Sequence, residues 1–375
     1  MKPKYLATIA ALGLGLASAS AQVDITGSTA GRASVHQQIL ALLSGESYAY
    51  TGTNINNASK AIFTGTYNNS TITVRVAWSG SATGLIDLQA NNNVAFLSTA
   101  TPISSGGTSS ANANLVEPGP ADVAFSDVFV TSTTAPATGL VNKNTYVIPF
   151  KWVASAAANS YPAFDNVTPA ALRQLYTTST LPLSQFTGNA TDKTVTVVAT
   201  GRDSGSGTRI TSMADMGYGV FAEVVQAEPS VTGSEITGLA DFAAGPNGGF
   251  DSGGTMANRL NKTSSIGIGG SIVLGYLGLS DAATALTTNG TNNQVAGKEL
   301  KYNGVTYSAD AVRNGNYSLW GYFHMYYKTT FSGSEKTFAD ALATAVAANP
   351  GSSGIVESTM LVERLTDGGN ITQKP

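Results

Sequence analysis

The segment VVATGRDSGSGTRITSM, residues 197–213, places two Gly–Ser pairs between two arginines. Serine hydroxyls in a tight turn can act as the nucleophiles of a hydrolase. A Gly/Ser turn that leads into a helix can instead present backbone N–H groups, hydroxyls and the positive end of the helix dipole to a bound anion. The segment alone allows both kinds of chemistry.

A serine hydrolase needs a general base, which is usually a histidine. The chain has two histidines: His36 lies in an apolar-periodic segment and His324 in an aromatic run, so both are predicted to be packed or surface residues. The segment FDSGG at 250–254 resembles the surroundings of a serine protease nucleophile, but no G-x-S-x-G elbow is present. We predict that Ser252 caps a helix, with a backbone contact to a ligand as the alternative. We therefore expect no catalytic residue and no enzyme.

The amino-acid composition argues against several classes of function. The chain has no cysteine and no histidine pair at ligand spacing, so we expect neither a metal site nor a cofactor. Its formal net charge is −3, which does not fit a nucleic-acid-binding protein. Charged residues make up 11% of the chain, so each one beside a Gly-rich turn is informative, although low charge by itself is ordinary for an exported protein.

The N-terminal residues 1–21, MKPKYLATIAALGLGLASASA, have the form of a secretory signal peptide. Lys2 and Lys4 precede an apolar run, and Ala19-Ser20-Ala21 matches an A-x-A cleavage site. No other apolar run is long enough to span a membrane. We therefore expect export to the periplasm or secretion, with stability supplied by the core of roughly 350 residues rather than by disulfides.

The elements that position the serine turns are predicted from local patterns. A helix is expected over residues 30–43, capped by Ser28 or Thr29, and a helix with Thr168 as N-cap and Pro169 at its first position follows a strong strand at 144–155. Strand, Gly/Ser turn and helix recur at residues 71–89 and 197–213. This alternation predicts an α/β fold with mostly parallel pairing.

A single Gly/Ser turn before a helix is better explained as a cap than as a ligand site. This chain has four such turns, with Arg202 and Asp127 at turn edges. The set favours a site for an anion.

These residues resemble the phosphate-binding proteins of bacterial phosphate ABC transporters. The central motif of that family is R-x-D-G-S-G-T, and this chain has Arg202-Asp203-Ser204-Gly205-Ser206-Gly207-Thr208. Three shorter segments, ITGSTAGRA at 25–33, GSATG at 80–84 and FSD at 125–127, are similar to family turns, and NGNYSLWGYFHMYY at 314–327 matches a C-terminal motif loosely. Their order along the chain strengthens the resemblance.

The resemblance implies a set of phosphate ligands. Donors would come from Ser28 and Thr29 in the first turn, Ser81 in the second, and Arg202, Ser206, Gly207 and Thr208 in the central motif. Asp127 would accept a hydrogen bond from a protonated phosphate oxygen. Sulfate lacks that proton near neutral pH, and a site built this way can discriminate by roughly 10⁴–10⁵.

Two departures from the family pattern leave the identity of the oxyanion open, with arsenate among the alternatives. The aspartate that steadies the family's arginine falls at Ser204, where neighbouring Asp203 could replace it. Arg32 stands at the start of the first helix, where relatives often have an aromatic residue or a proline. We interpret Arg32 as a surface residue, with a second cationic ligand as the alternative.

The resemblance also implies the architecture, a two-lobe periplasmic binding protein of type II (Venus-flytrap). Lobe 1 would comprise residues 22–148 plus 277–375 and lobe 2 residues 149–276, with crossings near Pro149 and Gly275. The implied function is capture of inorganic phosphate by a monomer and its delivery to an ABC permease in the inner membrane. A secreted surface or scaffold protein that retains the fold is the alternative.

Overall fold

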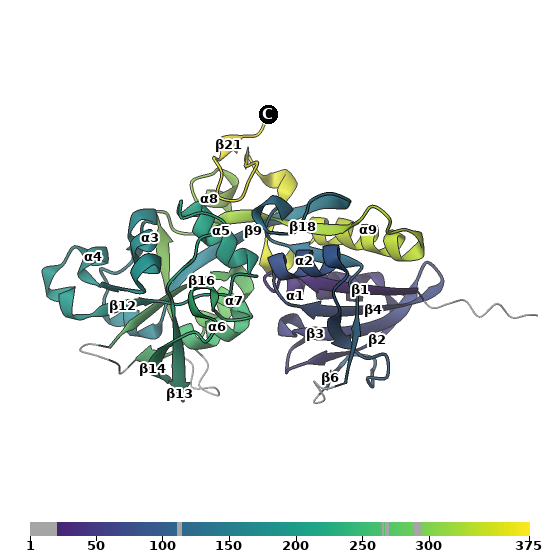
Figure 1. The fold of residues 1–375 in the computed structure, drawn as a ribbon, viewed down its shortest axis with the longest axis horizontal. Helices are drawn as coiled ribbons and strands as arrows, with labels where there is room; N and C mark the ends of the chain where they lie inside the picture. Colours follow the sequence, from purple (N-terminus) through teal and green to yellow (C-terminus); the bar gives the residue numbers. More distant parts are fainter. Residues whose placement is uncertain (1–20, 111–114, 265, 267–269, 289–294) are drawn as a thin grey trace, which may run out of the picture.

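Short apolar runs form the buried strands on which the molecule is built, such as IVLGYLG at 272–278 and TVVA at 196–199. Strands covered on both faces are apolar at nearly every position. The computed structural model describes residues 21–110, 115–264, 266, 270–288 and 295–375. In Figure 1 they form two lobes side by side, which we call lobe 1 (N-terminal strands, right) and lobe 2 (left).

Lobe 1 combines the N-terminal strands with two early helices and one late helix that covers the sheet. Its helices are α1 (Arg32–Leu42), α2 (Ser81–Ala90) and α9 (Gly333–Ala348). Its strands are β1 (Ala21–Gly27), β2 (Ser44–Thr51), β3 (Lys60–Tyr67), β4 (Ser70–Trp78), β5 (Val94–Leu97), β6 (Thr108–Ser110), β7 (Val116–Gly119) and β8 (Val123–Ser126). The expected signal peptide lies outside the described residues, apart from Ala21 in β1.

Lobe 2 carries shorter strands and more helices. Its helices are α3 (Pro169–Thr178), α4 (Ser184–Thr187), α5 (Gly207–Asp215), α6 (Gly253–Leu260), α7 (Leu279–Ala285) and α8 (Ala309–Arg313). Its strands are β10 (Asn166–Val167), β11 (Thr180–Pro182), β12 (Thr196–Ala199), β13 (Ala227–Thr232), β14 (Glu235–Asp241), β15 (Thr263–Ser264), β16 (Ile272–Gly278) and β17 (Lys298–Tyr302).

Two long strands, β9 (Leu140–Ala154) and β18 (Trp320–Lys328), join the lobes into one sheet of order β11-β12-β16-β9-β18-β8-β1-β4-β3-β2-β6. β1 is parallel to β4 and β8 in lobe 1, and β12 is parallel to β16 in lobe 2. β9 is antiparallel to β16 and β18. The predicted two-lobe α/β fold is confirmed, with parallel pairing at the strands that precede the serine turns.

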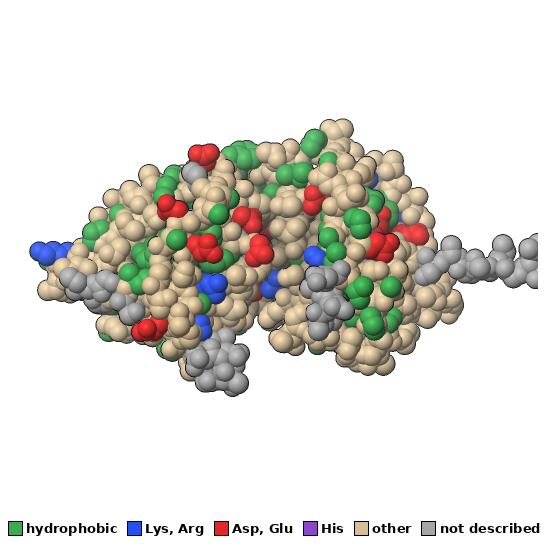
Figure 2. Space-filling model, turned by 60° about the horizontal axis from the view of Figure 1, so that its bottom comes forward, with side chains coloured by type: hydrophobic (Ala, Val, Ile, Leu, Met, Phe, Trp, Pro, Cys, Tyr) green, Lys and Arg blue, Asp and Glu red, His purple; other side chains and the backbone are tan. Residues whose placement is uncertain are grey.

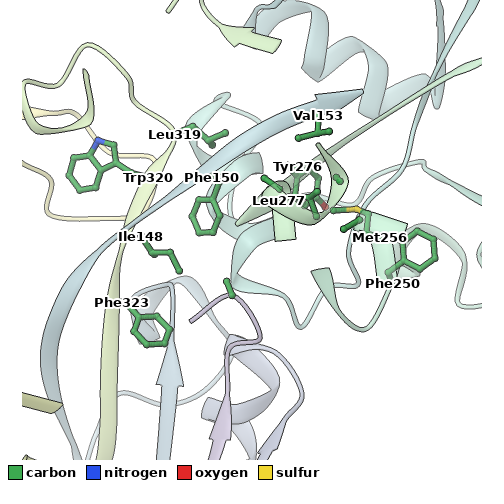
Figure 3. Close-up of a cluster of buried hydrophobic side chains, with 14 of the residues drawn as sticks. Ile148, Phe150, Val153, Phe250, Met256, Tyr276, Leu277, Leu319, Trp320 and Phe323 are labelled. Carbon is green, nitrogen blue, oxygen red and sulfur yellow. The ribbon is translucent and has the colours of Figure 1, made fainter. Parts of the chain in front are cut away.

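β9 changes partner strands at Pro149. Residues up to Pro149 pair with β18, where Pro149 lies opposite Trp320, and residues from Phe150 onward pair with β16. Proline has no amide hydrogen, so it is tolerated where the ladder passes from one partner to the next. Figure 3 shows apolar side chains from both sides of this point, including Phe150, Leu277 and Trp320, gathered along the crossing.

We propose a second crossing later in the chain than the expected one near Gly275. The return to lobe 1 was expected to begin at Leu277. However, α7 and β17 follow Leu277, and β17 pairs with the lobe 2 end of β9, where Lys298 lies opposite Ala154. We therefore propose that the chain returns to lobe 1 at Leu319–Trp320, where β18 begins.

Two of the predicted helix starts behave differently. Thr168 caps α3 as predicted, because its Oγ1 accepts a hydrogen bond from the amide of Ala171 at 3.3 Å. The cap predicted at Ser28 or Thr29 is wrong: α1 begins at Arg32, with Gly31 at the N-cap and no side-chain cap. Ser28 and Thr29 therefore lie in the turn before the helix. Within the described ranges, no helix is both long and apolar enough to cross a bilayer.

The C-terminal segment, residues 357–375, lies over the junction between the lobes (Figure 1, yellow, top) and includes β20 (Val362–Glu363) and β21 (Thr372–Gln373). Just before it, β19 (Ile355–Val356) pairs with β9. Arg364 pairs with Asp215 at the end of α5, with Nη1 and Oδ1 3.1 Å apart, and both side chains are buried. Asp367 Oδ2 accepts a hydrogen bond at 2.9 Å from the amide of Phe129, which lies two residues after Asp127 in the chain. The segment thus contacts elements of both lobes.

We predict that Arg364→Met lowers the free energy of unfolding by about 3–5 kcal/mol, because it leaves the Asp215 carboxylate buried without its partner. The matched control is Arg313→Met, which removes an exposed pair with Asp310 and should cost less than about 1 kcal/mol. Urea denaturation of both variants measures the difference, and equal losses would contradict the prediction.

Candidate anion-binding site

Three turns of lobe 1 bring polar side chains to one edge of the sheet. Thr29 follows β1, Ser81 begins α2 after β4, and Asp127 follows β8. The carboxyl ends of parallel strands lie at the same edge, which is where open α/β sheets bind their ligands. The three side chains are buried, at 3%, 0% and 0% exposed.

Lobe 2 supplies the opposite wall from β12 and α5. Arg202 follows β12 and is 1% exposed, and α5 begins at Gly207. Ser206 is the N-cap of α5, because its Oγ accepts from the amide of Arg209 at 3.3 Å. The first amides of α5, at Gly207 and Thr208, have no carbonyl partner within the helix and are directed along its axis.

The carboxylate of Asp127 is shared between the lobes. Ser81 Oγ donates to its Oδ1, and Thr208 Oγ1 donates to its Oδ2 at 3.1 Å. Burial raises the pKa of Asp127, while the hydrogen bonds from Ser81 and Thr208 and the charge of Arg202 act in the opposite direction. A buried carboxylate is stable when its lone pairs are satisfied, and here donors from both lobes satisfy them.

Gly207 allows this close approach of the lobes. A Cβ atom at this position would overlap Asp127 Oδ1. Glycine therefore lets the start of α5 reach the carboxylate that Ser81 also contacts.

Backbone carbonyls hold the guanidinium of Arg202. Its Nε donates to the oxygen of Phe250 and its Nη2 to that of Asp251, both at 2.9 Å. Its Nη1 reaches across the cleft to Thr29 Oγ1 at 3.2 Å. Asp203 Oδ1 accepts from the amide of Gly205 at 2.9 Å and does not hold the guanidinium directly. Burial raises the pKa of Asp203 and the charge of Arg202 opposes this, so the two side chains interact through their charges.

Arg32 is not a surface residue. It is 3% exposed, and its Nη2 lies 3.3 Å from Oδ1 of Asp281, which is also 3% exposed. Burial lowers the pKa of Arg32, and the charge of Arg202 lowers it further, so the two guanidinium groups are close enough to interact. The surface interpretation failed because the second lobe, which covers Arg32, is remote in sequence.

Asp281 was missed by the sequence reasoning. It follows a buried strand in the segment GLSDA, the same strand-then-Ser-Asp pattern that identified Asp127 in FSD. Burial raises the pKa of Asp281, and the charges of Arg32 and Arg202 lower it. The repeated pattern was the available signal.

All eight residues of the predicted phosphate site are buried. The structure brings Thr29 to Arg202, and Ser81 and Thr208 to Asp127. Gly207 lies against the same carboxylate. Ser206 is occupied as a cap, and Ser28 is within the turn, where its Oγ accepts from the amide of Ala30 at 3.2 Å. Their part in binding phosphate stays a prediction.

Among the described residues, several contacts cross between the lobes and hold them in a closed arrangement, and four of these lie around the candidate site. They are Thr208 with Asp127, Arg202 with Thr29, Arg32 with Asp281, and the amide of Ala82 with the oxygen of Gly205 at 2.9 Å. Figure 2 shows the face on which the lobes are separated by a notch, with Lys and Arg side chains beside the notch on an otherwise largely neutral surface.

Neither histidine is placed as a base for these serines. His36 Nε2 accepts from Trp78 Nε1 at 2.8 Å, and its Nδ1 lies 2.7 Å from the oxygen of Ile55. His324 Nδ1 lies 3.1 Å from Oδ1 of Asn142. Ser252 is the N-cap of α6, as predicted, and accepts from the amide of Thr255 at 3.1 Å. Among the described residues, no group of three or more His, Cys, Asp or Glu could hold a metal ion.

Comparison with solved structures identifies the fold. The chain is similar to a putative phosphate ABC transporter substrate-binding protein with bound phosphate from Clostridium perfringens, at 15% identity and TM-score 0.50, covering 89% of this chain and 98% of that one. It is also similar to an ABC-type phosphate transport receptor from Vibrio cholerae, at 15% identity and TM-score 0.47, covering 89% and 99%. A Corynebacterium glutamicum OxyR mutant matches at 11% identity and TM-score 0.41, covering 89% and 66%.

No protein-family profile matches the sequence, and no curated protein is similar to it. At these identities the structural likeness establishes the fold of a substrate-binding protein, and the ligand has to be argued from this chain's own residues.

We predict that Thr208→Val lowers the free energy of unfolding by about 1–3 kcal/mol, since it leaves a buried carboxylate oxygen of Asp127 without a donor. Thr337→Val, at an exposed position of α9, is the control and should change stability by less than about 0.5 kcal/mol. In an Asp127→Asn background the cost of Thr208→Val should differ from its cost alone. Additive effects in urea denaturation would show that the two side chains are not coupled.

The buried imidazole of His36 makes the stability of the fold depend on pH. Burial lowers the pKa of His36 to about 4, below its ordinary value of 6.5, so the neutral imidazole stabilises the fold above pH 6.5 and that contribution is lost as pH falls toward 4. The loss amounts to about 2 kcal/mol at pH 5. His36→Gln should therefore lose less unfolding free energy than the wild type between pH 7 and pH 5. Identical losses in urea denaturation at the two pH values would refute this.

Proposed function

We propose that this protein binds inorganic phosphate outside the cytoplasm, in the cleft between its lobes, and delivers it to an ABC-type permease. The observation that carries the proposal is the buried carboxylate of Asp127, placed among hydroxyl donors and opposite Arg202. No bond is made or broken, and the ligand is held only by hydrogen bonds and charge.

Arg202 is suited to be the main cationic ligand. Two of its nitrogens are held by the carbonyl oxygens of Phe250 and Asp251, so the guanidinium is oriented before a ligand arrives. The third, Nη1, is held by a neutral hydroxyl, that of Thr29, which a phosphate oxygen can replace. Hydrogen bonds to charged groups contribute roughly 1.5–3 kcal/mol each, so the exchange favours the anion.

Asp127 gives the site its selectivity. Phosphate keeps a proton near neutral pH, and a carboxylate can accept it, whereas sulfate has no proton to donate and meets a like charge. A site whose buried polar group stays unpaired with the wrong ligand can discriminate by roughly 10⁴–10⁵. Arsenate also carries a proton, so Asp127 does not exclude it.

Binding requires the lobes to part and close again. In the closed arrangement the hydroxyls of Ser81 and Thr208 are directed at Asp127 and not at a ligand. A phosphate placed between Arg202 and Asp127 would take over these donors, together with the free amides at the start of α5. Closure over the ligand would then remove it from water.

The cellular setting follows from the N-terminal sequence and the fold. A signal-like segment over residues 1–21 supports export, and the similar structure from Clostridium perfringens is that of a putative ABC transporter substrate-binding protein. We propose a periplasmic or secreted monomer that serves an inner-membrane permease. A surface or scaffold protein that keeps the fold without binding an oxyanion is the alternative that the next experiment tests.

Calorimetry on the purified, phosphate-stripped protein tests the proposal with phosphate, arsenate and sulfate. We expect the wild type to bind phosphate and to discriminate against sulfate by roughly 10⁴–10⁵. Asp127→Asn should reduce that discrimination at least about 100-fold, because an amide can donate to sulfate and no longer repels it. Asp241→Asn, at an exposed position of β14, is the control and should leave both affinities unchanged.

Two outcomes would overturn the proposal. If no oxyanion produces heat, the protein does not bind one and the scaffold alternative is favoured. If sulfate binds as tightly as phosphate to the wild type, Asp127 does not have the selective role assigned to it.

A further inference from the structure

A second hollow lies between the lobes on the Arg32 side of the cleft. Its volume is about 300 Å³. Lobe 1 contributes Arg32 and the loop after β2, from Thr51 to Asn54, while lobe 2 contributes the first turns of α6, around Ser252 and Thr255. We call it the Arg32 hollow. Its volume is at the lower end of the range for small-molecule sites, which is roughly 300–1,000 Å³.

The lining of the Arg32 hollow is polar throughout. Its lining residues are Thr, Asn, Ser and Gly together with Arg32, and none carries an apolar or an acidic side chain. Small-molecule sites are usually lined mainly by apolar and aromatic side chains, so this composition is unusual. Hydroxyl and amide groups can both donate and accept, which matches a ligand rich in hydroxyl groups.

The hollow lies next to the anion cradle, which we define as Thr29, Ser81, Asp127, Arg202 and Thr208. On the lobe 1 side, Thr29 of the cradle and Arg32 of the hollow are three residues apart. On the lobe 2 side, Arg202 donates to the oxygen of Asp251, the residue before Ser252 of the hollow. A ligand held in the cradle would therefore lie beside the hollow, with Arg32 between them.

Charge distinguishes what could occupy the hollow. Arg32 donates to Asp281 at 3.3 Å, and both side chains are buried, so the pair contributes no net charge. A second phosphoryl group would bring about one to two further negative charges and would meet no uncompensated cation there. A neutral group with several hydroxyls would meet matching donors and acceptors and would lose no charge solvation.

We propose that the cradle and the Arg32 hollow form one site for a phosphate monoester of a small polyhydroxylated molecule. The phosphoryl group lies in the cradle, and the hydroxyl-bearing part lies in the hollow. This inference rests on the proposed function in one respect, since the cradle has to bind a phosphoryl group. The inference differs from the proposed function in the ligand: an organic phosphate replaces the inorganic ion or binds in addition to it.

The role of Asp127 sets the conditions of the test. A monoester has a second pKa of about 6, so at pH 6 about half of it carries the proton that Asp127 accepts. Calorimetry at pH 6 with glycerol 3-phosphate and with inorganic phosphate compares the two ligands on the phosphate-stripped wild type. We expect glycerol 3-phosphate to bind at least as tightly as inorganic phosphate.

Asn258→Trp tests the hollow directly. Asn258 is an exposed residue of α6 that lines the hollow and does not belong to the cradle. Its replacement by Trp should fill the space, weaken glycerol 3-phosphate at least about 10-fold, and leave inorganic phosphate within about twofold. Asn316→Trp, at an exposed position outside the hollow, is the matched control and should affect neither ligand.

Each outcome decides between the two proposals. Tight inorganic phosphate with glycerol 3-phosphate more than about tenfold weaker would overturn this inference and leave the proposed function standing. Equal weakening of both ligands by Asn258→Trp would also overturn it, because the hollow would then not be specific to the ester. Absence of binding by both ligands to the wild type would overturn the proposed function and this inference together.

Discussion

The burial of one carboxylate governs the geometry of the cleft. Asp127 is fully buried, and an ionised carboxylate in that position is costly unless its lone pairs are satisfied. Its two oxygens accept from Ser81 in lobe 1 and from Thr208 in lobe 2. Because one donor comes from each lobe, both carboxylate oxygens of Asp127 have these donors only when the lobes are in contact. Contact between the lobes therefore completes the hydrogen bonding of Asp127.

Two arginines face this cleft and are held in different ways. Carbonyl oxygens hold Arg202, which leaves its positive charge uncompensated by a contacting carboxylate, while Asp281 neutralises Arg32. In our proposals, Arg202 therefore marks the position for an anionic group and Arg32 the position for a neutral polar group. The proposed ligand is assigned to these positions by this difference in charge compensation and not by the number of basic residues.

The crossing between the lobes links the site to the rest of the fold. β9 pairs with β18 up to Pro149 and with β16 beyond it, so one sheet passes through both lobes without interruption. Residues 357–375 cover this junction and contact both lobes. Arg364 pairs with Asp215 at the end of α5, and Asp367 accepts from the amide of Phe129 in the loop after Asp127. A change in the relative position of the lobes has to be accommodated by these contacts, which gives the C-terminal segment a mechanical connection to both halves of the cradle.

The sequence alone determined the features that depend on neighbouring residues. The caps at Thr168 and Ser252, the strand containing Pro149 and the turns at Arg202 and Asp127 could be predicted because helix starts, strand periodicity and motifs are local. Only the tertiary structure decided which remote groups meet. Arg32 was expected on the surface and is buried because Asp281, some 250 positions away, lies opposite it; Asp203 was expected to steady Arg202, and carbonyls of residues 250 and 251 hold its guanidinium directly. Burial and pairing across the cleft arise from the folding of one lobe onto the other, and no local pattern encodes them.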